Sequence, residues 1–243
     1  MKLSFTSLTG AFLLLALACP ASAQDESKED LVKRLKGQSG ATASRGLTSR
    51  GLKSRSLSPS ATPAASSETR SLYFSTRGIP KAVQAAAEED RVKITTTTAP
   101  SSNGAGQYPV AAGEAAVQVN YTVDPESKVA RDNILFRKGS ADFADDASVE
   151  VVVTLAEALK NPELAGLQYV IEGHASAEGD ASSNQSLSQE RAEQIVAVLT
   201  SLGVSHDRLL PVGFGETQAR FADHSPEALL KQDRRVLIYR LDH

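Results

Sequence analysis

The stretch YVIEGHASAEGDASSNQSLSQERAEQIVAVLTSLG, residues 169–203, decides the fold. It opens on a continuous apolar run from Tyr169 to Ile171, which predicts a buried strand. A polar loop from Gly173 to Asp180 follows. Beyond the loop, apolar residues recur on one stripe at helical spacing, and Gly203 is placed to end that helix. The stripe consists of Leu187, Ile195, Val198, Leu199 and Leu202.

Strands and helices alternate on both sides of this unit. The patterns predict strands over residues 117–123, 133–137, 209–214 and 236–241, and helices over residues 145–159 and 226–232. Pro162 ends the first of these helices, because proline cannot continue a helix. We therefore expect an α/β fold over residues 116–243, a two-layer domain whose helices pack on a mixed β-sheet.

Composition excludes several classes of protein. The chain has 243 residues, of which 41% are apolar and 23% charged, so it is neither fully disordered nor a polytopic membrane protein. Its single cysteine, Cys19, rules out an intrachain disulfide and a cysteine-based metal site. The net charge of -3 does not suit a polyanionic partner such as nucleic acid. The sequence has no phosphate-binding glycine loop, and no cofactor is expected.

The first 23 residues are typical of an export signal. Lys2 precedes an apolar run over residues 8–18, which is too short to span a bilayer, and an Ala-Ser-Ala cleavage site ends at Ala23. The protein is therefore expected to be exported. As an alternative, Cys19 could become a lipidated N-terminus, because the Ala-Leu-Ala that precedes it resembles a lipoprotein cleavage box.

Residues 24–115 differ in charge from the rest of the chain. They carry 13 Lys and Arg against 9 Asp and Glu, whereas residues 116–243 carry 12 against 20, which predicts a domain boundary near residue 115. Residues 25–36 could form a short amphipathic helix, but the remainder is rich in Ser, Thr and Arg. A five-residue repeat, which matches neither helix nor strand, places Arg45, Arg50 and Arg55 at even intervals. We expect a mostly disordered basic linker, either a plain spacer or a contact for an anionic envelope surface or an outer-membrane protein.

Five motifs in order carry a family resemblance. They are Ile134-Leu135-Phe136 with Gly139-Ser140-Ala141, the loop opening Gly173-His174, the helix residues Asn184, Leu187-Ser188 and Arg191-Ala192, then Gly213-Phe214-Gly215-Glu216, and finally Asp233-Arg234-Arg235-Val236. Residues 134–241 thus resemble the OmpA-like C-terminal domain of bacterial envelope proteins. The resemblance implies a non-enzymatic domain that binds peptidoglycan through the diaminopimelate of its stem peptide.

Diaminopimelate offers a carboxylate and an ammonium on one side chain. A pocket that selects it should present a cationic fork and, a few ångströms away, an anion or several acceptors. The resemblance assigns the fork to Arg191 and adds Asn184 as a ligand-binding residue. It also implies that one arginine of the pair Arg234 and Arg235 lines the pocket. Spacing leaves open which one, and Arg234 is taken as the candidate.

The anionic position departs from the family pattern. Family members carry Asp as the fourth residue of the Gly-x-Thr-Asp loop, where this chain has Ser176. Losing such a charge-assisted contact costs on the order of 1.5 to 3 kcal/mol. Glu178 could supply the acid, whereas Asp180 better suits the N-cap of the following helix. If Ser176 has abolished wall binding, the domain would instead serve envelope protein interaction or assembly.

The same loop contains the residue types of a hydrolytic triad in His174, Ser176 and Asp180. They crowd one loop, and no nucleophile-elbow motif accompanies them, so catalysis is not expected. His174 and Glu178 have no further ligands at suggestive spacing, so a metal site is not expected either.

Overall fold

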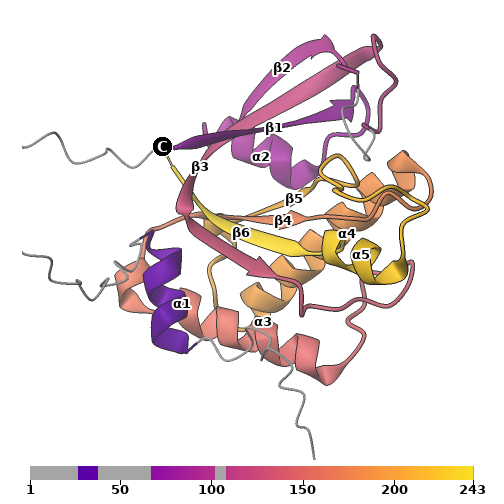
Figure 1. The fold of residues 1–243 in the computed structure, drawn as a ribbon. Coiled ribbons are helices and arrows are strands. Elements are labelled where there is room, and N and C mark those ends of the chain that lie inside the picture. Colours follow the sequence, from indigo (N-terminus) through magenta and orange to yellow (C-terminus); the bar gives the residue numbers. More distant parts are fainter. Residues whose placement is uncertain (1–26, 38–66, 102–107, 243) are drawn as a thin grey trace, which may run out of the picture.

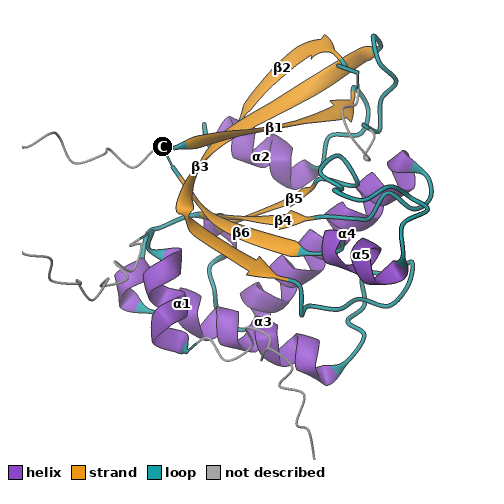
Figure 2. Ribbon diagram, in the orientation of Figure 1, coloured by secondary structure: helices purple, strands orange, loops and turns teal. Residues whose placement is uncertain are grey.

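The computed structural model describes residues 27–37, 67–101 and 108–242, which form one sheet with helices on both faces (Figures 1 and 2). The strands are β1 (Glu68–Ser75), β2 (Lys93–Thr98), β3 (Ala115–Arg131), β4 (Tyr169–Gly173), β5 (Leu209–Gly213) and β6 (Val236–Leu241). The helices are α1 (Lys28–Leu35), α2 (Lys81–Glu88), α3 (Asp146–Leu159), α4 (Ala181–Ser201) and α5 (Glu227–Asp233), with short 3-10 helices at Pro162–Leu164 and His206–Arg208.

The strand order is β1-β3-β6-β4-β5, with β2 paired to β3. Strands β4 and β5 run parallel, and the other pairings are antiparallel, so the sheet is mixed. One core lies between the sheet and helices α1, α3 and α4, and a second core lies between the sheet and α2. The predicted α/β class, with helices packed on a mixed sheet, is confirmed.

Several predicted elements form where the pattern placed them. Strands β4, β5 and β6 and helices α3, α4 and α5 match the expected ranges to within a few residues. Asp145 caps α3, because its carboxylate accepts the backbone N–H of Ser148 at 2.8 Å. Asp180 caps α4 in the same way through the N–H of Ser183 at 3.0 Å, which confirms the capping interpretation of this loop acid.

Two strand predictions need correction. Residues 133–137 do not form a strand, and their pairing is limited to an isolated bridge between Phe136 and Phe143. Gly139, at φ +68°, turns the chain so that the two phenylalanine rings stack with centroids 5.4 Å apart. The strand expected over residues 117–123 is longer, because β3 continues to Arg131 and pairs its second half with β6.

The expectation of a mostly disordered linker over residues 24–115 is wrong for its described parts. Helix α1 forms as predicted and buries Leu31, Val32 and Leu35 against α3. Strands β1 and β2 pair with β3, and α2 lies on the sheet, so the boundary near residue 115 falls inside a continuous structural unit. The buried apolar residues of this segment, among them Leu72, Phe74 and Val83, gain a core only by packing with a strand that lies beyond it.

Some sequence predictions lie outside the described residues. These are the export signal, Cys19 and the repeat with Arg45, Arg50 and Arg55. Within the described part of the chain, no helix is both long and apolar enough to span a membrane.

Candidate functional site

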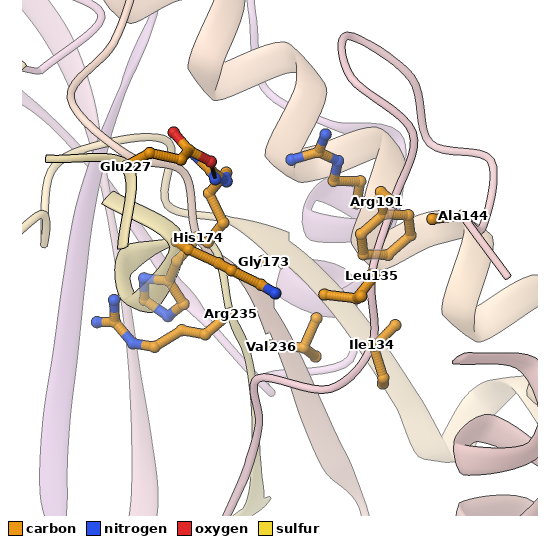
Figure 3. A pocket seen from close by; sticks show the side chains of 12 residues that line it. Ile134, Leu135, Ala144, Gly173, His174, Arg191, Glu227, Arg235 and Val236 are labelled. Carbon is orange, nitrogen blue, oxygen red and sulfur yellow. Dashed lines mark hydrogen bonds and ion pairs between the residues drawn. The ribbon is translucent and has the colours of Figure 1, made fainter. Parts of the chain in front are cut away.

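A cavity of about 280 Å³ opens where β4 ends and β6 begins (Figure 3). Its apolar lining consists of Ile134, Leu135, Phe136, Ala144 and Val236, and its charged lining consists of Arg191, Glu227, Lys231, Arg234 and Arg235, with Gly173 and His174 completing the wall. Figure 3 shows Arg191 and Glu227 on opposite sides of the cavity. Four cationic side chains and one carboxylate give the lining a net positive charge, which favours an anionic group.

Two glycines let α4 approach the sheet closely enough to present Arg191 to this cavity. A Cβ on Gly173 would lie 2.3 Å from the backbone oxygen of Ser188, and one on Gly213 would lie 2.4 Å from the backbone nitrogen of Gln189. Both contacts are too short for any side chain. The glycines at the ends of β4 and β5 are therefore required for helix packing, and the packing sets the position of the arginine.

Arg191 is buried, with 7% of its surface exposed. Its Nε donates to the carbonyl of Ser140 at 3.1 Å and its Nη2 to the carbonyl of Arg137 at 3.4 Å, and the guanidinium lies 5.0 Å from the ring centroid of Phe136. Burial lowers the pKa of Arg191, and the nearby Arg234 lowers it further. Among the described residues, no carboxylate forms an ion pair with it. The buried guanidinium thus has no ion-pair partner in the described part of the chain, and the charge of Glu190, which raises its pKa, acts from beyond ion-pair distance.

Arg234 contacts Glu178, the acid of the loop, beside the cavity. Its Nη1 lies 3.2 Å from a carboxylate oxygen of Glu178 and 3.5 Å from the hydroxyl of Ser176, while its Nη2 pairs with Glu227. The Ser176 hydroxyl in turn donates to Glu178 at 3.3 Å. The structure therefore brings Ser176, Glu178 and Arg234 together, next to the cavity that Arg191 lines.

Asn184 takes a different position from the other candidates. Its amide nitrogen donates to the carbonyls of Ser176 at 3.2 Å and Glu178 at 2.9 Å, and to the carboxylate of Glu216 at 2.6 Å. It is not part of the cavity lining. In this arrangement Asn184 fixes the shape of the loop that carries the other two residues.

Both arginines of the pair Arg234 and Arg235 line the cavity, which spacing alone did not resolve. The guanidinium of Arg235 donates to the carbonyl of Asp233 at 3.1 Å. Burial lowers its pKa, and so does the charge of Arg220. Sequence reasoning missed Glu227 and Lys231, because both lie on the short helix α5, where charged residues usually face solvent.

The residue types of a hydrolytic triad do not converge. The His174 ring stacks on Phe214 with centroids 5.1 Å apart, and its Nε2 lies 3.4 Å from Glu172. Ser176 bonds to Glu178, and Asp180 caps α4. Within the described ranges, no group of three or more His, Cys, Asp and Glu could hold a metal ion.

The described residues thus form an α/β domain with a cationic cavity where β4 ends and β6 begins. Residues 135–232 match the OmpA family. The chain is also 39% identical over 66 residues to outer membrane porin F of Pseudomonas fluorescens, across 27% of this chain and 20% of that protein. The match therefore spans one fifth of the length of this curated relative.

Solved structures with a similar fold come from several bacteria. One is the peptidoglycan-associated lipoprotein of Burkholderia pseudomallei, which is 24% identical, with 49% of this chain and 94% of that chain covered and a TM-score of 0.40. Another is the cell wall anchor of the T6SS of Pseudomonas aeruginosa, with 20% identity, 67% and 96% coverage and a TM-score of 0.39. The similarity that these comparisons identify is therefore to an OmpA family domain over residues 135–232.

Proposed function

We propose that this protein is a cell-envelope protein that binds peptidoglycan non-covalently, through the diaminopimelate of the stem peptide. The observation that carries the proposal is Arg191, a buried guanidinium that faces a cavity and whose hydrogen-bond acceptors among the described residues are backbone carbonyls. A ligand carboxylate would supply the missing counter-ion, and a bidentate contact with a planar fork is the geometry that such a pair prefers.

The ammonium of diaminopimelate would bind to the acid beside the cavity. The ammonium of diaminopimelate requires a carboxylate, and the family position for it holds Ser176. Glu178 lies two residues further along the loop and accepts from the Ser176 hydroxyl, and its carboxylate, which pairs with Arg234, lies beside the same pocket wall. In this proposal Glu178 takes the role of the family acid, and Ser176 orients it.

Co-sedimentation of the purified full-length protein with isolated peptidoglycan sacculi tests the proposal. The parent should pellet with sacculi at physiological salt, and Arg191→Ala should abolish pelleting. Arg191→Lys should bind weakly, because a lysine keeps the charge but loses the fork. Arg77→Ala is the matched control, because Arg77 is exposed and remote from the cavity lining. A parent protein that stays in the supernatant at every salt concentration refutes the proposal.

One observation favours a second candidate function, an envelope interaction or assembly module. Arg234 is already paired with both Glu178 and Glu227, so part of the cationic lining is neutralised without a ligand. The Arg191→Ala variant separates the two functions. Loss of sacculus binding with an unchanged melting temperature supports wall binding, whereas loss of folding, or unchanged sacculus binding, supports the structural role.

We further propose that the protein is exported, with residues 1–23 as the signal peptide, and that it resides in the periplasm or at the outer membrane. The arginine repeat would then reach toward an anionic envelope surface or an outer-membrane protein. A tether of this kind raises the effective concentration of a second contact, which would help a wall domain of reduced affinity. Mass determination of the secreted protein distinguishes cleavage after Ala23 from lipidation at Cys19.

A further inference from the structure

A buried carboxylate lies directly beside the proposed binding loop. Glu172 is the residue before Gly173 on β4, and its side chain is fully buried. An isolated carboxylate in such a place is very unfavourable unless it is paired and hydrogen-bonded. The residues that satisfy Glu172 therefore decide whether the end of β4 can hold this conformation.

The main partner of Glu172 comes from outside the residues that match the family. Arg70 on β1 donates from Nε at 3.1 Å and from Nη2 at 2.7 Å to the two carboxylate oxygens, and the Tyr121 hydroxyl on β3 donates at 2.6 Å. The Arg70 guanidinium also donates to the hydroxyl of Tyr239 on β6 at 3.1 Å and lies 4.8 Å from the centroid of its ring. The Arg70 guanidinium is thus held by contacts to β4 and β6, and its partner Glu172 is also held by a contact to β3.

His174 connects this cluster to the cavity. Its Nε2 lies 3.4 Å from Oε2 of Glu172, the oxygen that also accepts from Arg70 Nη2, its ring stacks on Phe214, and it belongs to the cavity wall. Its backbone N–H donates to the carbonyl of Arg235 at 3.0 Å. The loop that follows carries Ser176 and Glu178. A change at Glu172 would therefore reach the loop through a single residue.

We propose that Arg70 is a positioning residue of the peptidoglycan pocket, which acts through Glu172 and His174 on the loop that carries Ser176 and Glu178. The inference rests on the proposed function and deepens it. It also makes the β1–α2–β2 segment part of the binding unit, although that segment lies outside the family-matched residues.

The charges around His174 explain why the loss of Arg70 should displace the loop. Burial lowers the pKa of His174, and the charges of Arg235 and Arg70 lower it further, while Glu172 opposes them. Glu68 also pairs with Arg70 at 3.0 Å and Asp233 lies 3.6 Å from Arg235, while the hydroxyls of Tyr121 and Tyr239 contact Glu172 and Arg70. Without Arg70, the carboxylate would draw a proton onto His174, and the resulting imidazolium would lie against Arg235. Repulsion between the two cations would displace the start of the loop.

The test compares three variants of the full-length protein with the control Arg77→Met. Arg70→Met removes the fork, Arg70→Lys keeps a charge without the bidentate contact, and the double variant R70M/E172Q removes both buried charges together. Affinity for a soluble diaminopimelate-containing stem peptide is measured at a temperature where each variant is folded. In parallel, NMR without ligand follows the His174 ring titration and the amide signals of residues 173–178.

Arg70→Met should weaken binding about tenfold, because the loop must be reordered on binding, and R70M/E172Q should recover most of the loss. The His174 titration midpoint should rise in Arg70→Met alone, and Arg77→Met should change nothing. A folded Arg70→Met that binds like the parent, or a double variant as weak as Arg70→Met, overturns the proposal. If Arg70→Met does not fold, Arg70→Lys decides: weaker binding supports the role, and parental binding overturns it.

The ligand-free signals separate this inference from the proposed function. If the parent itself does not bind the peptide, the proposed function fails, yet the link from Arg70 to the loop is still decided by NMR. Shifted amides at residues 173–178 together with a raised His174 midpoint support the link. Unchanged amide signals and an unchanged midpoint in Arg70→Met refute it.

Discussion

Replacing Gly173 by alanine tests the packing that places Arg191 at the cavity. An alanine Cβ would lie 2.3 Å from the backbone oxygen of Ser188, about 1.1 Å short of the 3.4 Å at which ordinary contact begins. The obstacle is helix backbone, so no rotamer change relieves it, and α4 must move away from β4 by about that distance. Overpacking of this kind costs about 3 kcal/mol.

Two measurements follow from that displacement. For a unit of this size, each 1 kcal/mol lowers the melting temperature by about 2–4 °C, so Gly173→Ala should melt about 6–12 °C lower than the parent. Arg191 lies one turn beyond Ser188 on the same helix. A shift of about 1 Å exceeds the roughly 0.5 Å tolerance of a preorganised site, so stem-peptide affinity should also fall in the folded variant.

Gly78→Ala is the control for the Gly173 prediction. Its new Cβ would meet only the hydroxyl of Ser75, the end of a flexible exposed side chain, so the melting temperature should stay within about 2 °C of the parent. A Gly173→Ala protein with parental melting temperature and affinity would show that α4 is not held this close to the sheet. The account of how Arg191 is positioned would then be wrong.

Three further predictions concern the loop, acid stability and the segment before β6. Glu178→Gln should weaken stem-peptide binding while changing the free energy of unfolding by less than about 1 kcal/mol. Ser176→Asp should bring no gain in stem-peptide affinity, because its carboxylate would face Glu178. Calorimetry measures the affinity of both variants. The pKa of His174 is lowered by burial below its unfolded value of 6.5, so the unfolded chain takes up the proton first. The free energy of unfolding should therefore fall as pH drops below about 6.5. His174→Gln should reduce this pH dependence, which urea denaturation at several pH values measures. Burial opposes ionisation of Glu172, but hydrogen bonds from its neighbours outweigh it and lower its pKa from 4.5, so a second loss of stability should follow in acid. Asp233→Ala should destabilise by about 3 kcal/mol in urea denaturation, because it leaves two backbone N–H groups and an arginine without their buried acceptor.

The sequence alone determined the central elements and pointed to two side chains that line the cavity, Arg191 and Arg234. Continuous apolar runs predicted β4, β5 and β6, and helical spacing with acidic caps predicted α3 and α4, because each of these signals is local. The family resemblance pointed to Arg191 and to the loop with Ser176 and Glu178. The structure then places Glu178 and Arg234 in contact, a pairing across 56 residues that no local pattern contains.

Only the tertiary structure decided the role of the N-terminal half. The segment with β1, α2 and β2 was expected to be a linker, yet β1 and β2 pair with β3 and α2 covers the sheet. Arg70 gave no sequence signal either, since a lone arginine on a strand is usually solvated. It becomes significant because folding buries Glu172 opposite it, and a buried charge depends on whatever partner the fold brings to it.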